Sequence, residues 1–260
     1  MNTPMSRWRL EGQTALICGA SKGIGRACAR ELAMLGANVL MVARDDVYLE
    51  TVRSELAEEF PACNVLAMAA NLSESEPRLQ VFDWVADLGL PLSLLVNNVG
   101  TNVSKPVLDY SASEVNKLIQ TNVLTAFEMC RLAHAQLSAH PNAAIVNVGS
   151  VAALTHVRTG APYGMSKAAI HQMTRNLACE WADDGIRVNA VAPWYIRTQR
   201  SELALADADY LDEVLERTPL GRIGEPEDVA AAVAFLCLPA AAYVTGQVIA
   251  VDGGFVHYGF

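Results

Sequence analysis

Short apolar runs alternate with longer segments of helical periodicity along the whole chain. The apolar runs have strand length and lack the alternation of a half-buried strand, which is typical of strands covered on both faces. Seven runs predict strands at 14–18, 38–43, 64–69, 92–96, 144–148, 187–191 and 247–251. The segments between them predict helices at about 23–35, 46–59, 74–88, 113–138, 163–183 and 227–236. This alternation predicts an α/β fold with a doubly wound, seven-stranded parallel sheet and helices on both faces.

No Gly/Ser linker, charge block or internal repeat divides the chain, so we expect a single domain over residues 1–260. The βα rhythm is interrupted only between residues 193 and 226, where prolines flank a short helical pattern at 206–216. Long insertions in compact domains are often lids or binding loops. We therefore predict a substrate lid over 193–226.

Composition narrows the class of protein. With 52% hydrophobic and 18% charged residues, the chain can bury a large core, and its net charge of −9 offers no footprint for a nucleic-acid backbone. The six cysteines form no CxxC pair, which favours reduced thiols and no metal site. The N-terminal stretch lacks the apolar core of a signal peptide, and the longest apolar tract, 229–238, is too short to span a bilayer. We expect a cytoplasmic protein without nucleic-acid or membrane partners.

The first predicted strand runs into a turn with glycines at 19, 23 and 25, and then into an amphipathic helix. Glycines let the backbone turn sharply and let a pyrophosphate approach the helix N-terminus, where unpaired N–H groups favour negative charge. The spacing G-x-x-x-G-x-G differs from the G-x-G-x-x-G of larger dehydrogenases, but its strand-turn-helix setting favours dinucleotide binding over a purely structural turn.

The second predicted strand ends where NAD enzymes of this architecture place a carboxylate for the adenosine ribose. Ala43 stands there and Arg44 follows it. An arginine offers a fork of donors to a 2′-phosphate, and Lys22 in the glycine-rich turn supplies a second positive charge. The pattern favours NADP(H) as the cofactor; the alternative is that both cations merely lie on a solvated rim.

Tyr163 and Lys167 are four residues apart at the start of a predicted helix, so their side chains share one face. A tyrosine with its ordinary pKa of about 10 is a poor proton donor at neutral pH, and an adjacent ammonium lowers that pKa. We expect Lys167 to lower the pKa of Tyr163. Since this spacing also occurs by chance on exposed helices, it does not identify a site by itself.

Together the motifs resemble those of the short-chain dehydrogenase/reductase family over nearly the whole chain. The resemblance is carried by Gly19, Gly23 and Gly25, by Asn97-Asn98-Val99-Gly100, and by Asn122, Ser150, Tyr163 and Lys167. It implies a Rossmann fold with strand order 3-2-1-4-5-6-7 and assembly into homodimers or homotetramers.

The resemblance also implies a catalytic role for four residues. Tyr163 would protonate the developing alkoxide while the nicotinamide delivers hydride to the carbonyl carbon. Ser150 would hold the carbonyl oxygen by a hydrogen bond that strengthens as charge develops. Lys167 would also bind the nicotinamide ribose, and Asn122 would position a water in a proton relay.

Further cofactor contacts follow from the resemblance. Asn71 stands where the family usually has an aspartate beside the adenine, so its amide would preserve part of that contact. The expected cofactor-binding residues are Gly19, Ser21, Lys22, Gly23, Ile24, Gly25, Arg44, Asn71, Leu72, Asn98, Gly100, Tyr163, Lys167, Pro193, Ile196 and Thr198.

The segment 193–198 and the ending Gly253-Gly254-Phe255 resemble the tropinone-reductase-like branch of the family. Ser104 stands where tropinone reductases place His or Tyr to orient a cationic substrate, which argues against tropinone itself. We expect a small carbonyl compound in a mainly apolar pocket. The residues expected to contact it are Ser104, Ser150, Ala152, His156, Tyr163, Trp194 and Tyr195.

Three functions fit this sequence. The first is NADPH-dependent reduction of a ketone to a secondary alcohol. The second is reduction of a 3-oxoacyl thioester, which uses the same four residues but requires a basic patch to dock an acidic acyl carrier protein; the candidates are Arg158, Arg197, Arg200 and Arg222. The third is a catalytically silent NADP-binding regulator, against which the intact set of four residues argues.

Overall fold

A seven-stranded parallel sheet with the order β3-β2-β1-β4-β5-β6-β7 forms the centre of the molecule, which confirms the predicted fold class. The computed structural model describes residues 5–259. The strands are β1 (Thr14–Cys18), β2 (Asn38–Ala43), β3 (Val65–Ala69), β4 (Leu92–Asn97), β5 (Ala144–Val148), β6 (Arg187–Pro193) and β7 (Val248–Val251). The α-helices are α1 (Gly23–Met34), α2 (Asp46–Glu59), α3 (Ser75–Asp87), α4 (Ala112–Ile119), α5 (Thr125–Leu137), α6 (Ala161–Glu180), α7 (Gln199–Leu205), α8 (Ala208–Glu216) and α9 (Pro226–Cys237).

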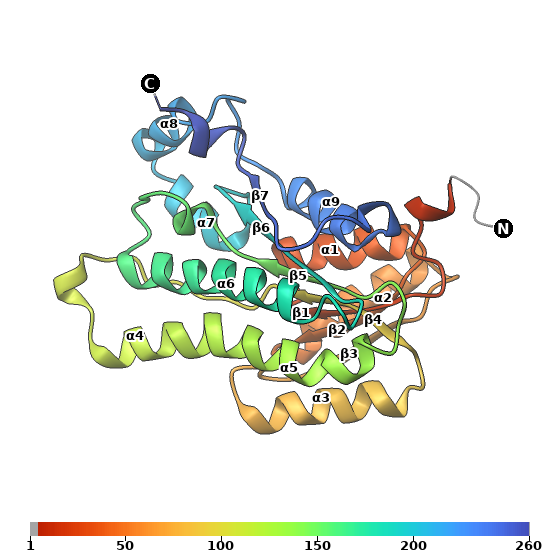
Figure 1. The fold of residues 1–260 in the computed structure, drawn as a ribbon. Helices are drawn as coiled ribbons and strands as arrows, with labels where there is room; N and C mark the ends of the chain where they lie inside the picture. Colours follow the sequence, from red (N-terminus) through yellow and green to blue (C-terminus); the bar gives the residue numbers. More distant parts are fainter. Residues whose placement is uncertain (1–4, 260) are drawn as a thin grey trace.

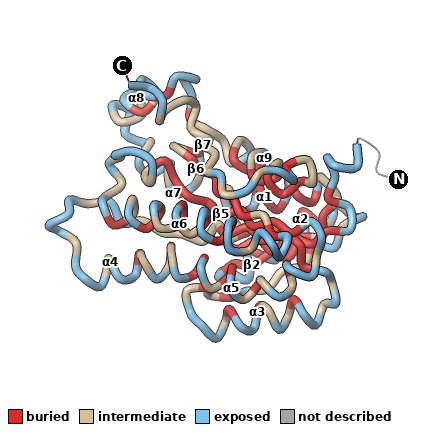
Figure 2. The backbone as a smooth tube through the Cα atoms, viewed as in Figure 1, coloured by how far each residue is buried: buried red, intermediate tan, exposed pale blue. Residues whose placement is uncertain are grey.

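The sheet separates two hydrophobic cores. Helices α1, α2 and α9 cover one face, and α3, α5 and α6 cover the other (Figure 1). Successive strand residues point to opposite faces, so Leu16 packs in one core and its neighbour Ile17 in the other, both fully buried. Burial is accordingly concentrated in the strands and in the sheet-facing sides of the helices (Figure 2). This explains why the strands read as unbroken apolar runs.

The strand order reverses direction between β1 and β4, which lie side by side although they are far apart in the sequence. Their last residues, Cys18 and Asn97, are paired, so the segments that follow them leave the sheet at the same level. Ligands of open α/β sheets bind at such a switch point, outside the carboxyl ends of the strands.

The structure corrects three details of the predicted elements. The segment expected as one helix at 113–138 is instead α4, a π-helical turn at Gln120–Leu124, and α5. The segment 193–226 contains two helices, α7 and α8, where the sequence pattern indicates only one at 206–216. Pro193 is the last residue of β6, paired with Val251, rather than the start of the irregular stretch.

Within residues 5–259, no helix combines the length and apolar composition needed to span a bilayer.

Candidate active site

The glycine-rich turn after β1 is shaped by contacts that only glycine permits. A Cβ on Gly25 would lie 2.0 Å from the Gly19 carbonyl oxygen, and Gly19 itself has φ +83°. The Asn98 side chain, from the segment after β4, donates its Nδ2 to that same oxygen at 3.0 Å. The turn is thereby held against the neighbouring strand end.

Helix α1 begins at Gly23 without a side-chain cap, so its first N–H groups remain available to an anion. A Cβ on Gly23 would lie 3.0 Å from Cγ2 of Thr198, which caps the start of α7. The glycine-rich turn and the segment after β6 therefore meet at Gly23 and Thr198, two positions where the sequence predicts cofactor contacts, and the uncapped start of α1 is suited to an anion.

Two cations flank the rim beyond this turn. Lys22 Nζ lies 4.6 Å from the ring centroid of Tyr48, and Arg44 is exposed, with no carboxylate within ion-pair distance in the described part of the chain. The neighbouring Asp45 accepts a hydrogen bond from the Tyr48 N–H and so caps α2. Neither cation forms an ion pair among the described residues, although the carboxylates of Asp45 and Asp46 follow Arg44 directly.

Other expected cofactor residues are engaged in the structure. Asn71 donates to Glu74 Oε1 at 2.6 Å and accepts from the Ser73 hydroxyl at 2.8 Å, so its amide organises the start of α3. Leu72 is buried, and Ile196 is buried beside Gly224, with which it forms an isolated β-bridge. The contact expected between Asn71 and an adenine would compete with the hydrogen bonds already made.

Tyr163 and Lys167 lie in the first turns of α6, beside the end of β5. The buried Lys167 ammonium donates to the Val148 carbonyl at 2.8 Å and lies 5.8 Å from the centroid of the Tyr163 ring. Burial, and then the charge of Arg200, lowers the pKa of Lys167 to about 8. The spacing-based prediction that these two side chains share one face is therefore reproduced in space.

The predicted direction of the Tyr163 pKa was wrong. Burial raises the pKa of Tyr163, while a side-chain hydrogen bond with Ser150 and the charge of Arg200 lower it by less. Lys167 is not among the groups that produce the shift, and the net result is a phenol that holds its proton more firmly than an ordinary tyrosine.

Ser150 follows β5 and caps a short 3-10 turn, Val151–Ala153. Its Oγ accepts a hydrogen bond from the Ala152 N–H at 3.1 Å. Since the backbone uses Ser150 as an acceptor, the hydroxyl proton can be donated to a substrate oxygen.

The Asn122 side chain joins the segment after β4 to helix α6. Its Oδ1 accepts from the Thr101 N–H at 2.7 Å, and its Nδ2 donates to the Thr101 carbonyl at 2.9 Å and to Ser166 Oγ at 3.0 Å. A Cβ on Gly100 would lie 3.4 Å from Lys167 Nζ and 3.6 Å from Asn122 Oδ1. Gly100 thus lets the chain pass close to both polar side chains.

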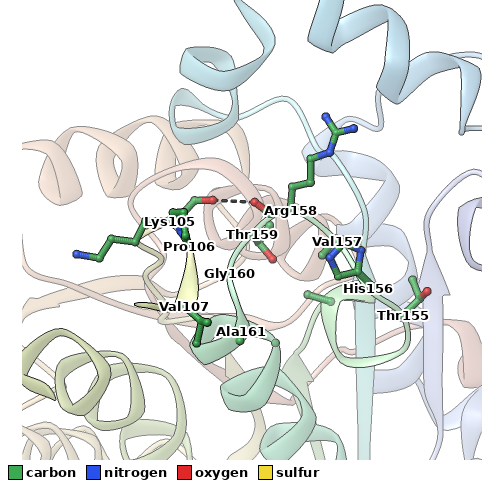
Figure 3. Close-up of a pocket in the computed structure, with 13 residues that line it drawn as sticks. Lys105, Pro106, Val107, Thr155, His156, Val157, Arg158, Thr159, Gly160 and Ala161 are labelled. Carbon is green, nitrogen blue, oxygen red and sulfur yellow. Dashed lines mark hydrogen bonds between the residues drawn. The ribbon is translucent and has the colours of Figure 1, made fainter. Parts of the chain in front are cut away.

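An open cavity of about 630 Å³ lies beside these residues (Figure 3). It is bounded by the loop after β4, the segment after β5 and the start of α6, and includes Gly164, the neighbour of Tyr163. Of the predicted substrate contacts, Ser104, Ala152 and His156 line it, whereas Ser150 and Tyr163 do not, although their neighbours Ala152 and Gly164 do. The Ser104 hydroxyl donates to the Arg158 carbonyl at 2.7 Å, which ties two walls of the cavity together.

Trp194 and Tyr195, also predicted to contact substrate, are not among the residues that line this cavity. Trp194 stacks on Phe255 with ring centroids 3.7 Å apart and donates its Nε1 to Thr218 at 3.2 Å. The Tyr195 hydroxyl hydrogen-bonds to that of Tyr210 at 2.6 Å. The two aromatic residues hold the 193–226 segment together, a role that the sequence pattern did not indicate.

The four arginines considered as a docking patch do not behave alike. Arg158, Arg197 and Arg222 form ion pairs with Glu213, Glu225 and Asp228. Arg200 instead donates to the Gly100 carbonyl at 3.1 Å.

No group of His, Cys, Asp or Glu side chains among the described residues could hold a metal ion. All six cysteines are free; Cys18, Cys28, Cys130 and Cys237 are buried, whereas Cys63 is partly buried and Cys179 is exposed.

A Rossmann-type sheet with a glycine-rich turn at its switch point, and a Ser-Tyr-Lys group beside it, defines a class of nicotinamide-dependent oxidoreductases. The family described as enoyl-(acyl carrier protein) reductase matches residues 19–256. The chain belongs to the short-chain dehydrogenase/reductase family.

Individual relatives agree with this assignment. A tropinone reductase homolog of Arabidopsis thaliana is 45% identical over 264 residues, covering 98% of this chain and 96% of the relative. The structure is similar to a gluconate 5-dehydrogenase from Burkholderia cenocepacia in complex with NADP and tartrate, with a TM-score of 0.92, 29% identity, and coverage of 98% and 99% of the two chains. It is also similar to a 7α-hydroxysteroid dehydrogenase complexed with NADH and 7-oxo glycochenodeoxycholic acid, with a TM-score of 0.90, 29% identity, and 98% of each chain covered.

Proposed function

We propose that this protein reduces a ketone to a secondary alcohol with NADPH, in a reversible reaction. The observation that carries the proposal is the meeting of Ser150, Tyr163 and Lys167 beside a cavity, with Lys167 against Gly100 in the segment after β4. Bound nicotinamide would supply the hydride. The protein would supply orientation, a hydrogen bond to the carbonyl oxygen and a proton.

Tyr163 is the proposed proton donor. The phenol holds its proton at neutral pH, as a proton donor must, although burial makes it a weaker acid than an ordinary tyrosine by raising its pKa. The reverse reaction needs the phenolate and is therefore favoured at higher pH. The Ser150 hydroxyl would donate a hydrogen bond to the substrate oxygen, and the buried Lys167, held by the Val148 carbonyl, would bind the nicotinamide ribose.

The choice of NADP(H) rests on the adenosine rim. The structural relatives carry NADP in one case and NADH in the other, so they support a nicotinamide cofactor of either kind. In this chain, Arg44 has no carboxylate partner among residues 5–259, and Ala43 replaces the carboxylate typical of NAD enzymes. Arg44 and Lys22 provide the positive charge that a 2′-phosphate needs.

The 3-oxoacyl-thioester alternative is less well supported. Three of its four candidate docking arginines, Arg158, Arg197 and Arg222, are already paired with carboxylates. A regulator without turnover would not need the buried Lys167 beside Tyr163.

We also infer that the protein is cytoplasmic and forms a homodimer or homotetramer, with residues 193–226 as a lid. The exposed apolar side chains of Leu124 and Phe127 are compatible with a subunit interface.

The experiment that tests the proposed chemistry compares Tyr163→Phe with the wild type on a panel of cyclic and linear ketones, with a β-ketoacyl thioester included. We expect the variant to lose at least about 10²-fold in kcat, while its Kd for NADPH stays within about twofold, because only the phenol proton is removed. Retained turnover would overturn the acid role of Tyr163. Tight NADPH binding by the wild type without reduction of any carbonyl would favour the regulator.

The cofactor is tested with the same substrates. We expect a higher kcat/KM with NADPH than with NADH, and Arg44→Asp should move the preference toward NADH by at least about tenfold, since it replaces a cation with an acceptor for ribose hydroxyls. Arg53→Asp, an exchange of an arginine that pairs with Glu50 on α2, is the matched control. A wild-type preference for NADH would contradict the assignment.

A further inference from the structure

Arg200, the second residue of α7, differs from the arginines around it. Its Nη2 donates to the carbonyl of Gly100 at 3.1 Å, although the two residues are a hundred positions apart. No carboxylate of the described chain lies within ion-pair distance of it, in contrast to the nearby Arg197, which pairs with Glu225 at 3.0 Å. The guanidinium is exposed, and it is directed at the site rather than at a surface carboxylate.

The contact with Gly100 places the Arg200 guanidinium beside the reacting groups. Gly100 lies against Lys167 and Asn122: a Cβ added to it would lie 3.4 Å from Lys167 Nζ and 3.6 Å from Asn122 Oδ1. Burial raises the pKa of Tyr163 and lowers that of Lys167; the charge of Arg200 opposes the first shift and adds to the second, and no carboxylate contributes to either. The site therefore holds two cationic side chains, and no acidic group of the described chain acts on its titrating residues.

The start of α7 is fixed, so the Arg200 side chain extends from a firm base. Thr198 caps the helix through Ser201, and its methyl group abuts the glycine-rich turn at Gly23. A guanidinium forms stronger hydrogen bonds with a carboxylate than with a neutral carbonyl, and it can bind a carboxylate with two parallel bonds.

We propose that Arg200 binds a carboxylate of the substrate, so that the ketones preferred by this enzyme are oxo acids; this rests on the reductase function proposed above. In the reduction, the carbonyl carbon gains a hydride from the nicotinamide, its oxygen gains a proton from Tyr163, and the carboxylate is unchanged. The rest of the molecule would extend toward the cavity lined by Ala152 and Gly164, of which Arg200 is not itself a lining residue. Arg200 is a specificity residue in this scheme and takes no part in the transfer of hydride or proton.

The test compares two oxo acids, 4-oxopentanoate and 4-oxocyclohexanecarboxylate, with their methyl esters and with cyclohexanone. The enzymes are the wild type, Arg200→Gln, Arg200→Lys, and Arg197→Gln as the matched lid control. We expect the wild type to favour at least one acid over its ester in kcat/KM by about tenfold or more. Arg200→Gln should abolish that preference, with most of the loss in KM and less than about threefold change for the ester. Arg200→Lys should retain part of it, and Arg197→Gln should retain all of it.

Binding provides a readout without turnover. Isothermal titration of the preferred oxo acid into NADPH-loaded Tyr163→Phe protein should show a Kd about tenfold or more tighter than in the Tyr163→Phe/Arg200→Gln double variant. The Kd for NADPH should be the same in both proteins within about twofold.

Three outcomes would overturn the proposal. If the wild type reduces the esters and cyclohexanone but never prefers an acid, the oxo-acid inference fails while the reductase function stands. If Arg200→Gln weakens NADPH binding and lowers activity on acid and ester equally, Arg200 serves the cofactor phosphates instead. If no ketone is reduced, the reductase function itself fails, and the substrate inference fails with it.

Discussion

His171 is buried, and its surroundings explain why residue 149 is a glycine and why the stability of the protein should depend on pH. It lies one helical turn beyond Lys167, and neither ring nitrogen has a hydrogen-bond partner among the residues that the structure describes. A Cβ on Gly149 would lie 2.1 Å from its Nε2, so glycine is required directly before Ser150 for the ring to pack there. Burial, followed by the charges of Arg175 and Lys167, lowers the pKa of His171 to about 4.

This shift predicts a loss of stability in acid. In the unfolded chain a histidine has its ordinary pKa of about 6.5, so between pH 6.5 and 4 the unfolded state binds more protons than the folded state. The free energy of unfolding should therefore fall as the pH is lowered through this window, by up to about 3 kcal/mol from this residue. Urea unfolding at pH 7 and pH 4.5 measures it. His171→Phe should reduce the difference between the two pH values, and the exposed His257→Gln should leave it unchanged. Equal pH dependence in wild type and His171→Phe would contradict this origin.

The π-helical turn between α4 and α5 has a clear structural consequence. It interrupts two α-helical segments whose residues otherwise follow ordinary helical spacing. Such turns are frequent at functional sites because the extra residue redirects a side chain. Here the redirected residue is Asn122, which is buried and uses three hydrogen bonds to hold Thr101 and Ser166.

Loss of these bonds should affect both stability and turnover. Asn122→Ala leaves the Thr101 N–H and carbonyl without their partners, so we expect the free energy of unfolding to fall by about 1–3 kcal/mol and kcat to fall by more than about tenfold. Denaturant titration and steady-state kinetics measure the two effects. Asn116→Ala, at an exposed position on α4, is the control and should change the free energy of unfolding and kcat much less than Asn122→Ala does. Unaltered kcat in a destabilised Asn122→Ala would assign Asn122 a structural role alone.

The proposed lid is assembled from parts of the chain that are distant in sequence. Trp194 stacks on Phe255 near the C-terminus, and the Leu220 N–H donates to the Gly253 carbonyl at 3.0 Å. Helix α8 and the C-terminal segment lie together at one end of the molecule (Figure 1). Arg158 from the cavity wall pairs with Glu213 on α8 at 2.8 Å. The lid is thereby attached both to the C-terminal segment and to the wall of the cavity.

The stacked pair should govern how well the lid holds substrate. Phe255→Ala removes one ring of the stack, so we expect a KM for the ketone at least about threefold higher and faster cleavage within 193–226 in limited proteolysis. The free energy of unfolding should fall by about 1–3 kcal/mol, because an aromatic pair contributes stacking as well as buried area. Leu203→Ala, at an 84% exposed lid position, is the matched control. An unchanged KM together with unchanged proteolysis would show that the lid does not depend on this stack.

Residue patterns alone predicted much of this protein correctly. Strands covered on both faces must be apolar throughout, and a turn that lets Gly25 approach the Gly19 carbonyl must be glycine, so both features are visible in the order of residues. The spacing of Tyr163 and Lys167 likewise follows from one helical turn. These features depend on local geometry or on a burial that repeats with each element.

Only the tertiary structure decided the rest. Three sets of contacts join residues from different elements: the hydrogen bonds of Asn122, the stacking of Trp194 on Phe255, and the contact of Arg200 with Gly100. The upward shift of the Tyr163 pKa likewise comes from burial by surrounding elements. Periodicity reports which face of an element is buried and carries no information on which distant side chain meets it there. Burial and long-range contact set the charge and orientation of the site, and these arise only when the sheet has brought its strand ends together.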